Sequence, residues 1–456
     1  QDIIKIVKEC YLLMFKNGAQ VGLLLFGMFF GAGNLIFPPS LGFQAGMLFT
    51  PAILGFLLSG IGMPVIAVIM GTFNPGGFRA EMNRKISPLF SLIILTLMYL
   101  AIGPLMAIPR TAATSFSIGI LPITGDGMLP LAIFTTLYFV CAWWLSITPS
   151  KLLDRVGKVL TPIFAIMIVL LIIVGMIAYT TPSTAAPMGK YAASAFGNGF
   201  VEGYNTVDTL ASFAFCIIAL GAMKRIHFAS EKEHIASVWM AGAAVAVLMG
   251  GLYLGLALLG NHFPIPQSVY EDASVNLGAY VLSQTSFQIF GTIGMAFLAV
   301  MVTLTCFTTT VGLIAAVSTF FAEEFPVLSY KKYVTLVCLV SLFLANLGLN
   351  QIIQVTLPLL LFVYPIAISV VMLTIVNKFV GLSKLGMRCT VAAAGIVSAI
   401  DIAAQFFHLD GAAALIQGLP LGDSGLGWLV PVLVCLVLSL VLPGKISGES
   451  ALEESL

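Results

Sequence analysis

Charged side chains are scarce in this sequence. Of its 456 residues only 9% are Asp, Glu, Lys or Arg, whereas 59% are hydrophobic, and the mean hydropathy is +1.07. Soluble globular proteins carry roughly a quarter charged residues, so this chain cannot cover the surface of a soluble domain of its length. The formal net charge of +1 offers no excess that would attract nucleic acid or an acidic substrate. These features exclude a soluble enzyme, a DNA-binding module and a disordered scaffold.

Patterns for metals, disulfides and catalysis are also lacking. The seven cysteines stand singly, mostly within apolar runs, so we interpret them as small buried hydrophobic residues. The four histidines lie in loops or at the ends of apolar runs, away from any carboxylate cluster. No Ser/His/Asp grouping and no phosphate-binding loop occurs in the sequence. We therefore expect neither an enzyme nor an organic cofactor.

Apolar runs of about 20 residues, the length that crosses a bilayer as a helix, recur along the whole chain. They predict an all-α polytopic membrane protein, a single transmembrane domain over residues 1–456 with twelve transmembrane helices. The predicted spans are 18–46, 48–71, 88–117, 128–148, 158–180, 197–222, 234–260, 287–321, 331–348, 352–378, 388–407 and 426–443. Residues 273–290 are too polar for a lipid-facing span, so we expect an external helix or a re-entrant segment there.

The basic residues orient these spans. Positive charge collects on the cytoplasmic side of a membrane protein. With both termini in the cytoplasm, eighteen of the twenty basic residues lie on that side: Lys5, Lys8, Lys16, Arg79, Arg84, Lys85, Lys151, Arg155, Lys158, Lys224, Arg225, Lys232, Lys331, Lys332, Lys378, Lys384, Arg388 and Lys445. Only Lys190 falls outside, and Arg110 lies within a span. We interpret residues 1–16, which lack a cleavage site, as a cytoplasmic amphipathic lead-in.

The first span contains a predicted helix break. Gly31, Gly33 and Asn34 are poor helix-interior residues, and paired prolines follow four positions later. Non-helical backbone at membrane depth is tolerated where it lines a cavity. A second half-helix starting here would direct free N–H groups and its dipole at an anion. The alternative is a glycine-lined packing face.

The sixth span contains a second break. Residues 197–209 include six polar or ionisable side chains, which a lipid-facing helix would not carry. We expect a short half-helix, an unwound elbow near residues 204–206 and a long half-helix. Asp208 is one of very few intramembrane carboxylates, which points to function, although a helix-capping role is the alternative.

Breaks in spans one and six, five spans apart, indicate an inverted-repeat transporter with a site at the membrane midplane. The predicted repeats are residues 18–180 (helices 1–5) and 197–378 (helices 6–10), and residues 388–443 form accessory helices 11 and 12. In the eighth span, threonines cluster over residues 303–310. Their hydroxyls could hold an alkali cation, or they could simply bond to their own helix backbone.

Several motifs together resemble the bacterial branched-chain amino acid:cation symporter family, the leucine/isoleucine/valine carriers of the amino acid–polyamine–organocation superfamily. They run in the expected order from the first to the eighth span: residues 26–39, residues 103–104 with 108–111, residues 202–206 with Asp208, and Thr308-Thr309 with Gly312. The resemblance implies the five-plus-five, leucine-transporter-like fold with helices 1 and 6 broken. It also implies Na⁺ as coupling ion and import of Leu, Ile and Val through the bacterial inner membrane.

The resemblance also suggests a role for individual residues. The Na⁺ ligands would be carbonyls of Gly27, Phe30 and Thr305 and hydroxyls of Thr308 and Thr309. The substrate carboxylate would lie against the amides of Gly31, Ala32 and Gly33, and its amine against carbonyls near Tyr204 and Asn205. Further expected substrate contacts are Phe29, Asn34, Gly203, Thr206 and Asp208. Phe30, Phe213 and Phe215 are candidates, beside Phe29, for an apolar lining.

Arg110 is expected either to gate the outer vestibule or to extend to the membrane interface, with Asp208 or Asp401 as its candidate partner. Three functional alternatives remain open. The same fold could couple to H⁺ through Asp208 or Glu202, or it could carry an aromatic or small neutral amino acid. A channel or a membrane enzyme is the third alternative.

Overall fold

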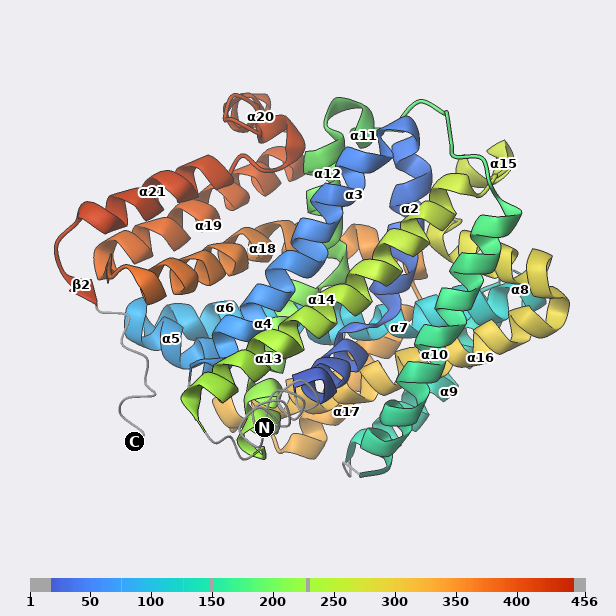
Figure 1. The fold of residues 1–456 in the computed structure, drawn as a ribbon, viewed down its shortest axis with the longest axis horizontal. Coiled ribbons are helices and arrows are strands. Elements are labelled where there is room, and N and C mark those ends of the chain that lie inside the picture. Colours follow the sequence, from blue (N-terminus) through green and yellow to red (C-terminus); the bar gives the residue numbers. More distant parts are fainter. Residues whose placement is uncertain (1–17, 75, 126, 148–150, 227–229, 447–456) are drawn as a thin grey trace, which may run out of the picture.

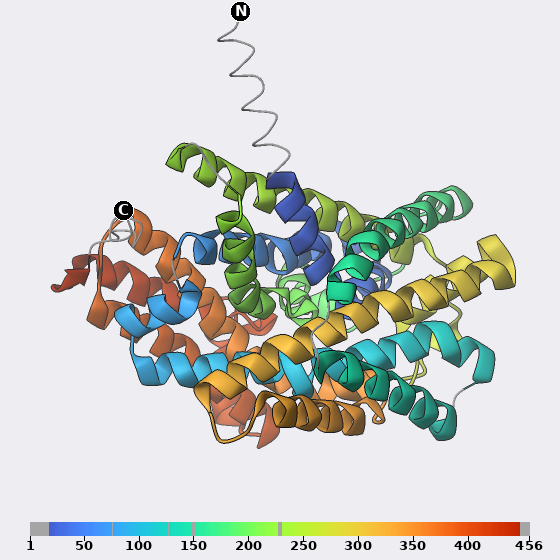
Figure 2. The same cartoon turned by 90° about the horizontal axis from the view of Figure 1, so that it is seen from below.

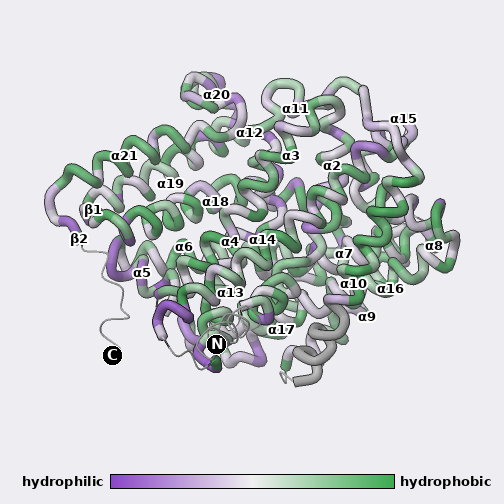
Figure 3. The backbone as a smooth tube through the Cα atoms, in the orientation of Figure 1, coloured by the Kyte–Doolittle hydropathy of each residue, from purple (hydrophilic) through white to green (hydrophobic). Residues whose placement is uncertain are grey.

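Long apolar helices make up almost all of the described chain. The computed structural model describes residues 18–446 apart from 75, 126, 148–150 and 227–229, so the predicted lead-in over residues 1–16 lies outside the described residues. Figure 3 shows hydrophobic residues along most helices, with hydrophilic residues gathered at α5 (Gly77–Lys85) and at other helix ends. This distribution is that of a protein embedded in lipid.

The first half of the chain contains the helix Gly18–Phe29, α2 (Ala32–Ala45), η1 (Gly46–Leu48), α3 (Phe49–Leu57), η2 (Leu58–Gly62), α4 (Met63–Thr72), α5, α6 (Pro88–Leu100), η3 (Ala101–Leu105), α7 (Ala107–Ser115), η4 (Phe116–Ile120), α8 (Leu121–Thr124), α9 (Met128–Ile147) and α10 (Lys151–Ala178). The second half contains α11 (Lys190–Ala193), α12 (Ala195–Glu202), η5 (Gly203–Thr206), α13 (Asp208–Lys224), α14 (Glu231–His262), α15 (Gln267–Tyr270), α16 (Leu277–Glu324), α17 (Tyr330–Ala345), α18 (Leu349–Phe379), β1 (Leu382–Ser383), α19 (Lys384–Phe406), α20 (Asp410–Gln417), η6 (Gly422–Ser424), α21 (Leu429–Val441) and β2 (Lys445–Ile446).

Every predicted span falls on one of these helices or on a run of consecutive ones. By length and apolar composition alone, seven helical segments of the described chain can cross a membrane, or eight if the bent pair α12–α13 counts as one span. Three further apolar helices are shorter: Gly18–Phe29, Pro162–Ala178 and Leu429–Val441. The predicted all-α, multi-span architecture is confirmed, whereas the number of twelve and the repeat boundaries stay predictions.

Both predicted helix breaks are present. The first helix ends at Phe29, and α2 starts at Ala32 after two non-helical residues. In the sixth span, α12 passes through the 3₁₀ turn η5 to Val207, where the chain bends by 46° into α13. Val207 has a φ of +67°, which is uncommon for a β-branched residue and is maintained only when the surroundings impose it.

The polar segment expected over residues 273–290 is helical from Leu277 onward, and this helix continues directly into the eighth span. α16 contains 48 residues and crosses the molecule diagonally in Figure 2. Its helical geometry is interrupted at Gly291, which has a φ of +64°. Two helices therefore meet at Gly291, and the more C-terminal one carries the threonine cluster.

Glycines bring the broken helices into direct backbone contact with their neighbours. Gly42 and Gly260 lie where α2 crosses α14, and Gly55 and Gly199 lie where α3 crosses α12. A Cβ atom at any of these four positions would come within 1.9–2.1 Å of a carbonyl oxygen on the opposite helix. In lipid, where helices associate through close packing, small residues at crossings permit this approach. Each broken helix is thus held against a helix from the other predicted repeat.

The last helices lie at one end of the molecule. α18, α19 and α21 run side by side there (Figure 1), and the two-stranded pairing of β1 with β2 joins their ends. The loop before α21 also reaches the sixth span, because the Ser424 hydroxyl donates to the Ser194 hydroxyl at 2.8 Å. The segment between the two predicted accessory helices therefore contacts the N-terminal half of a broken helix.

Gly260→Ala tests the helix crossings. We expect the substitution to destabilise the protein by about 1–3 kcal/mol, because the new methyl group would overlap the Pro39 carbonyl oxygen, 2.0 Å away. Gly251→Ala on the same helix is the control, since no neighbouring atom lies within 4 Å of a Cβ there. Thermal unfolding of the detergent-solubilised protein measures both. Equal melting temperatures for the two variants would contradict the close crossing.

Candidate functional site

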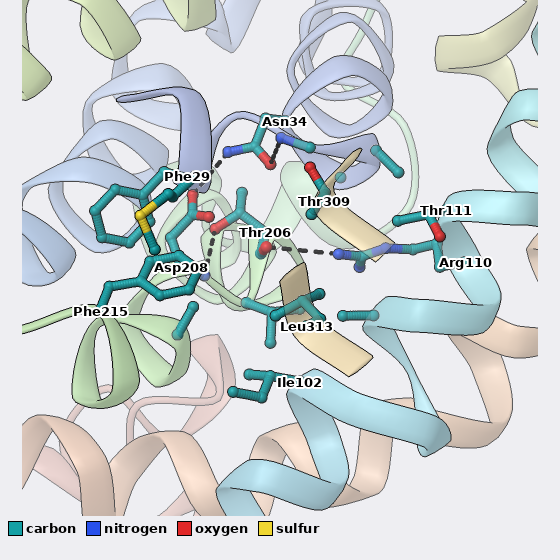
Figure 4. A pocket seen from close by; sticks show the side chains of 17 residues that line it. Phe29, Asn34, Ile102, Arg110, Thr111, Thr206, Asp208, Phe215, Thr309 and Leu313 are labelled. Atoms are coloured by element: carbon teal, nitrogen blue, oxygen red, sulfur yellow. Dashed lines mark hydrogen bonds between the residues drawn. The ribbon is translucent and has the colours of Figure 1, made fainter. Parts of the chain in front are cut away.

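A small cavity lies where the two helix breaks meet α7 and α16 (Figure 4). Its volume is about 40 Å³. The lining residues are Met28, Phe29, Gly31, Ala32, Gly33, Asn34, Ile102, Ala107, Arg110, Thr111, Thr206, Val207, Asp208, Ala211, Phe215, Thr309 and Leu313. The cavity is thus built from the breaks themselves, from an apolar wall and from two charged side chains.

Asp208 lies at the start of α13 and is held by two neutral donors. Its Oδ2 accepts hydrogen bonds from the Asn34 amide at 2.9 Å and from the Tyr253 hydroxyl at 2.7 Å. The Asn34 amide also donates to the Tyr253 hydroxyl. These three residues are buried, and they come from α2, α13 and α14. The network therefore joins both breaks to the long helix that follows the second one.

Arg110 reaches the second break from α7. Its guanidinium group donates to the carbonyl oxygen of Asn205 and, at 3.5 Å, to that of Thr206. The side chain is only 3% exposed, so the predicted extension to the membrane interface is wrong. The prediction that Asp208 or Asp401 pairs with Arg110 is also wrong, because neither forms an ion pair with it in the described structure. The free carbonyls at the elbow attract the guanidinium instead, and a gating role stays a prediction.

The freed backbone of the first break also has a partner. The Gly31 N–H donates to the Asn34 Oδ1 at 3.2 Å, so Asn34 binds the break through its oxygen and Asp208 through its nitrogen. Of the three amides expected to meet a carboxylate, that of Gly31 is therefore already occupied. Ala32 and Gly33 line the cavity at the first turn of α2, where the helix dipole favours an anion.

The predicted cation ligands on α16 lie at the edge of this cavity. The Thr308 and Thr309 hydroxyls both donate to the Thr305 carbonyl, at 2.9 and 3.2 Å, and keep their lone pairs free. Thr309 lines the cavity and lies beside the first break. A Cβ atom added to Gly31 would be 3.8 Å from the Thr309 Oγ1. The Thr305 hydroxyl is buried without a hydrogen-bond partner. This oxygen-rich donor set is chemically compatible with an alkali cation.

An apolar wall closes one side of the cavity. Phe29 and Phe215 pack edge to face with ring centroids 5.1 Å apart, and Ile102 and Leu313 lie nearby in Figure 4. Phe30 and Phe213, the other two candidates for this lining, are not part of it. Phe30 packs on Phe26 and Phe164, and Phe213 stacks on Phe78.

Seven of the ten predicted substrate contacts line the cavity: Phe29, Gly31, Ala32, Gly33, Asn34, Thr206 and Asp208. Gly203, Tyr204 and Asn205 do not line it. Asn205 contributes its carbonyl to Arg110, and Tyr204 faces a separate small cavity beside Asp401 and Trp428. Of the predicted cation ligands only Thr309 reaches the lining, while Gly27, Phe30, Thr305 and Thr308 lie outside it.

Tyr253 is the important residue that the sequence did not reveal. It lies in the C-terminal half of the 32-residue helix α14, among apolar residues and glycines and without a charged neighbour to distinguish it. For Tyr253 the only available signal was a polar residue within an apolar stretch of helix. Thr111, which the sequence analysis included only as the last residue of the 108–111 motif, also lines the cavity, and its hydroxyl is hydrogen-bonded to that of Thr310.

Tyr253→Phe tests the network around Asp208. Removing the hydroxyl leaves the carboxylate with one donor fewer in an apolar interior, so we expect a loss of about 1–3 kcal/mol in stability and reduced activity. Tyr99→Phe is the control, because the Tyr99 ring stacks on Phe320 and its hydroxyl forms no hydrogen bond with a described residue. Thermal unfolding compares the two variants. If they are equally stable, the Tyr253 hydroxyl does not support Asp208.

Comparison with known proteins shows the family to which the chain belongs. The profile of a family described as "Branched-chain amino acid transport protein" matches residues 14–446. A relative from Staphylococcus saprophyticus is 39% identical over 444 residues, covering 96% of this chain and 98% of the relative. One from Staphylococcus haemolyticus is 38% identical over 436 residues, covering 94% and 97%. The names of both relatives describe them as branched-chain amino acid carrier proteins.

Solved structures share the fold. The inward-facing conformation of Mhp1 matches with a TM-score of 0.59 at 16% identity, covering 96% of this chain and 94% of that chain. A manganese transporter from Eremococcus coleocola, in complex with an aromatic bis-isothiourea compound, matches with a TM-score of 0.60 at 13% identity, covering 94% and 95%. These similarities confirm the leucine-transporter-like fold. The chain belongs to the branched-chain amino acid transport protein family, and it is a membrane transporter and not an enzyme.

Proposed function

We propose that this protein imports leucine, isoleucine and valine together with Na⁺ across the bacterial cytoplasmic membrane. The observation that carries the proposal is the cavity between the two helix breaks, whose lining is divided between polar groups and apolar side chains. A branched-chain amino acid has the same division, since its charged backbone groups adjoin a purely aliphatic side chain. Membership of the carrier family supports this choice of substrate.

The apolar wall suits an aliphatic side chain. Phe29, Phe215 and Leu313 offer it no hydrogen-bonding group, so a polar side chain would lose its hydration without gaining a partner. An apolar pocket disfavours amino acids with charged side chains, but it distinguishes the branched-chain amino acids from one another only by the space for a methyl group. We therefore expect the three branched-chain amino acids to compete with each other.

Sodium coupling would follow from the position of Thr309. Its hydroxyl belongs to α16 and lies beside Gly31 in the first break. A cation held by the hydroxyls of Thr308 and Thr309, the Thr305 carbonyl and the carbonyls of Gly27 and Phe30 would join α16 to the first helix. Such a link stabilises one arrangement of the two helices, and a substrate that binds that arrangement better is thereby coupled to the ion.

The proposed orientation places both termini in the cytoplasm. Cytoplasmic loops then carry nearly all of the basic residues, and Lys190 on the opposite side forms an ion pair with Glu202. Proteolysis of closed right-side-out vesicles, with tags at either end, tests this orientation directly.

Uptake of radiolabelled leucine into proteoliposomes tests the function. We expect accumulation with an inward Na⁺ gradient and little with a choline gradient of equal strength. Excess unlabelled isoleucine and valine should abolish the signal, whereas glutamate should leave it unchanged. Equal uptake in Na⁺ and choline would refute Na⁺ coupling, and the absence of leucine uptake in every condition would refute the substrate.

Thr308→Ala and Thr309→Ala test the ion ligands. Each substitution removes one proposed oxygen ligand, so the Na⁺ concentration for half-maximal uptake should rise by about 10- to 100-fold. Thr303→Ala, on the same helix but outside the proposed ligand set, should behave as wild type. A normal Na⁺ requirement in either of the first two variants would show that its hydroxyl is not a ligand.

Proton coupling is the second candidate, and Asp208 is the observation that favours it. A carboxylate that is 3% exposed and held by two neutral donors could carry a proton through the transport cycle. An inward proton gradient without Na⁺ separates the two mechanisms, since only a proton-coupled carrier would accumulate leucine under that condition.

A further inference from the structure

We propose that Asp208 and Arg110 are side-chain anchors for the two charged ends of the substrate: Asp208 binds its α-ammonium group, and Arg110 binds its α-carboxylate. This inference deepens the proposed function, because it rests on the cavity being the binding site for an amino acid. It differs from recognition by helix ends alone, in which backbone groups would bind both charges.

Two opposite charges line the cavity without contacting each other. Asp208 and Arg110 are each 3% exposed, and no ion pair joins them in the described structure. Removing either charge from water is expensive unless an opposite charge compensates for it. Their separation therefore leaves both charges incompletely compensated. A zwitterion placed between them would supply the missing partner to each.

Asp208 is arranged to accept a cation. The hydrogen bonds to its Oδ2 come from neutral groups, the Asn34 amide and the Tyr253 hydroxyl, and its other hydrogen-bond partner, Thr206, is neutral too. These donors orient the carboxylate but do not neutralise it, and Oδ1 keeps capacity to accept. An ammonium group is the part of an amino acid that can provide both hydrogen bonds and positive charge.

Arg110 is arranged to accept an anion. The acceptors that it already binds, the Asn205 and Thr206 carbonyls, are neutral, and its Nε is buried without a partner. Its guanidinium group also abuts the first turn of α2, because a Cβ on Gly33 would lie 2.7 Å from Nη2. The guanidinium and the amide end of α2 thus combine their positive potential at one side of the cavity.

The same contacts exclude the simplest alternative for the ammonium group. In that alternative, the carbonyls at the elbow of the sixth helix would bind the substrate amine. Two of these carbonyls, those of Asn205 and Thr206, are already bound by Arg110. A substrate amine that reached them would also meet the like charge of the guanidinium. Asp208 is the acidic side chain in the cavity lining, and so it is the acceptor that remains.

Leucine analogues that lack one charged group test the assignment. 4-Methylpentanoate lacks the amino group, and 3-methylbutylamine lacks the carboxylate. Their affinities are measured by competition with leucine uptake and by thermal stabilisation of the purified transporter. Wild type should bind leucine at least about 100-fold more tightly than either analogue, since each analogue leaves one buried charge without its partner.

Asp208→Asn should weaken leucine binding by about 100-fold and leave 4-methylpentanoate binding unchanged or tighter, because that analogue has no ammonium group to lose. Arg110→Gln should weaken leucine binding similarly and spare 3-methylbutylamine. Asp401→Asn is the control outside the cavity and should preserve all three affinities. A merely structural role for Asp208 or Arg110 would weaken all three ligands in proportion.

Proportional weakening by either substitution therefore overturns the assignment for that residue. If Asp208→Asn or Arg110→Gln fails to fold, Asp208→Glu and Arg110→Lys keep the charge while moving it. These two conservative substitutions should weaken leucine binding by about 10-fold and retain the preference for leucine over both analogues. Loss of that preference would overturn the proposal. The proposed function fails separately, if wild type binds neither leucine nor the analogues.

Discussion

Backbone groups released from a helix inside a membrane need partners, and the whole site is arranged around this requirement. Lipid offers no hydrogen bonds, so every N–H or C=O freed by a break must be bound by protein, by water or by a ligand. Asn34 binds the Gly31 amide, and Arg110 binds the carbonyls of Asn205 and Thr206. The polar residues of this apolar chain are therefore concentrated where its helices are interrupted.

This requirement explains how charged side chains come to lie so deep in the protein. Arg110 is needed because two carbonyls at the elbow have lost their helical donors. The buried positive charge of Arg110 then needs a negative charge nearby, and Asp208 provides one without forming an ion pair with it. The breaks thus produce, through one layer of supporting residues, a cavity with a positive side and a negative side. Such polarity matches a zwitterion, and it requires very few charged residues.

Much of this arrangement was predictable from the sequence, because its signals are local. Gly31, Gly33 and Asn34 mark the first break, and the polar segment ending in Asp208 marks the second. Apolar runs likewise revealed where the helices are. The partner of Arg110 was not predictable, since a carbonyl oxygen exists at every residue and only the elbow makes two of them available. Tyr253 escaped notice for a related reason, as its role depends on facing Asp208 across 45 residues of chain.

The hydrogen bonds among Asn34, Asp208 and Tyr253 have a mechanical consequence. They connect α2, α13 and α14, while glycine crossings hold α2 directly against α14. If any one of these helices slid past the others, the buried Asp208 carboxylate would lose its hydrogen bonds from Asn34 or Tyr253. The three helices should therefore move as one rigid body. A conformational change of the transporter would then bend the chain outside this body. Two positions could act as hinges for such a motion: Val207, which has a left-handed conformation directly before α13, and Gly291, where α16 is interrupted.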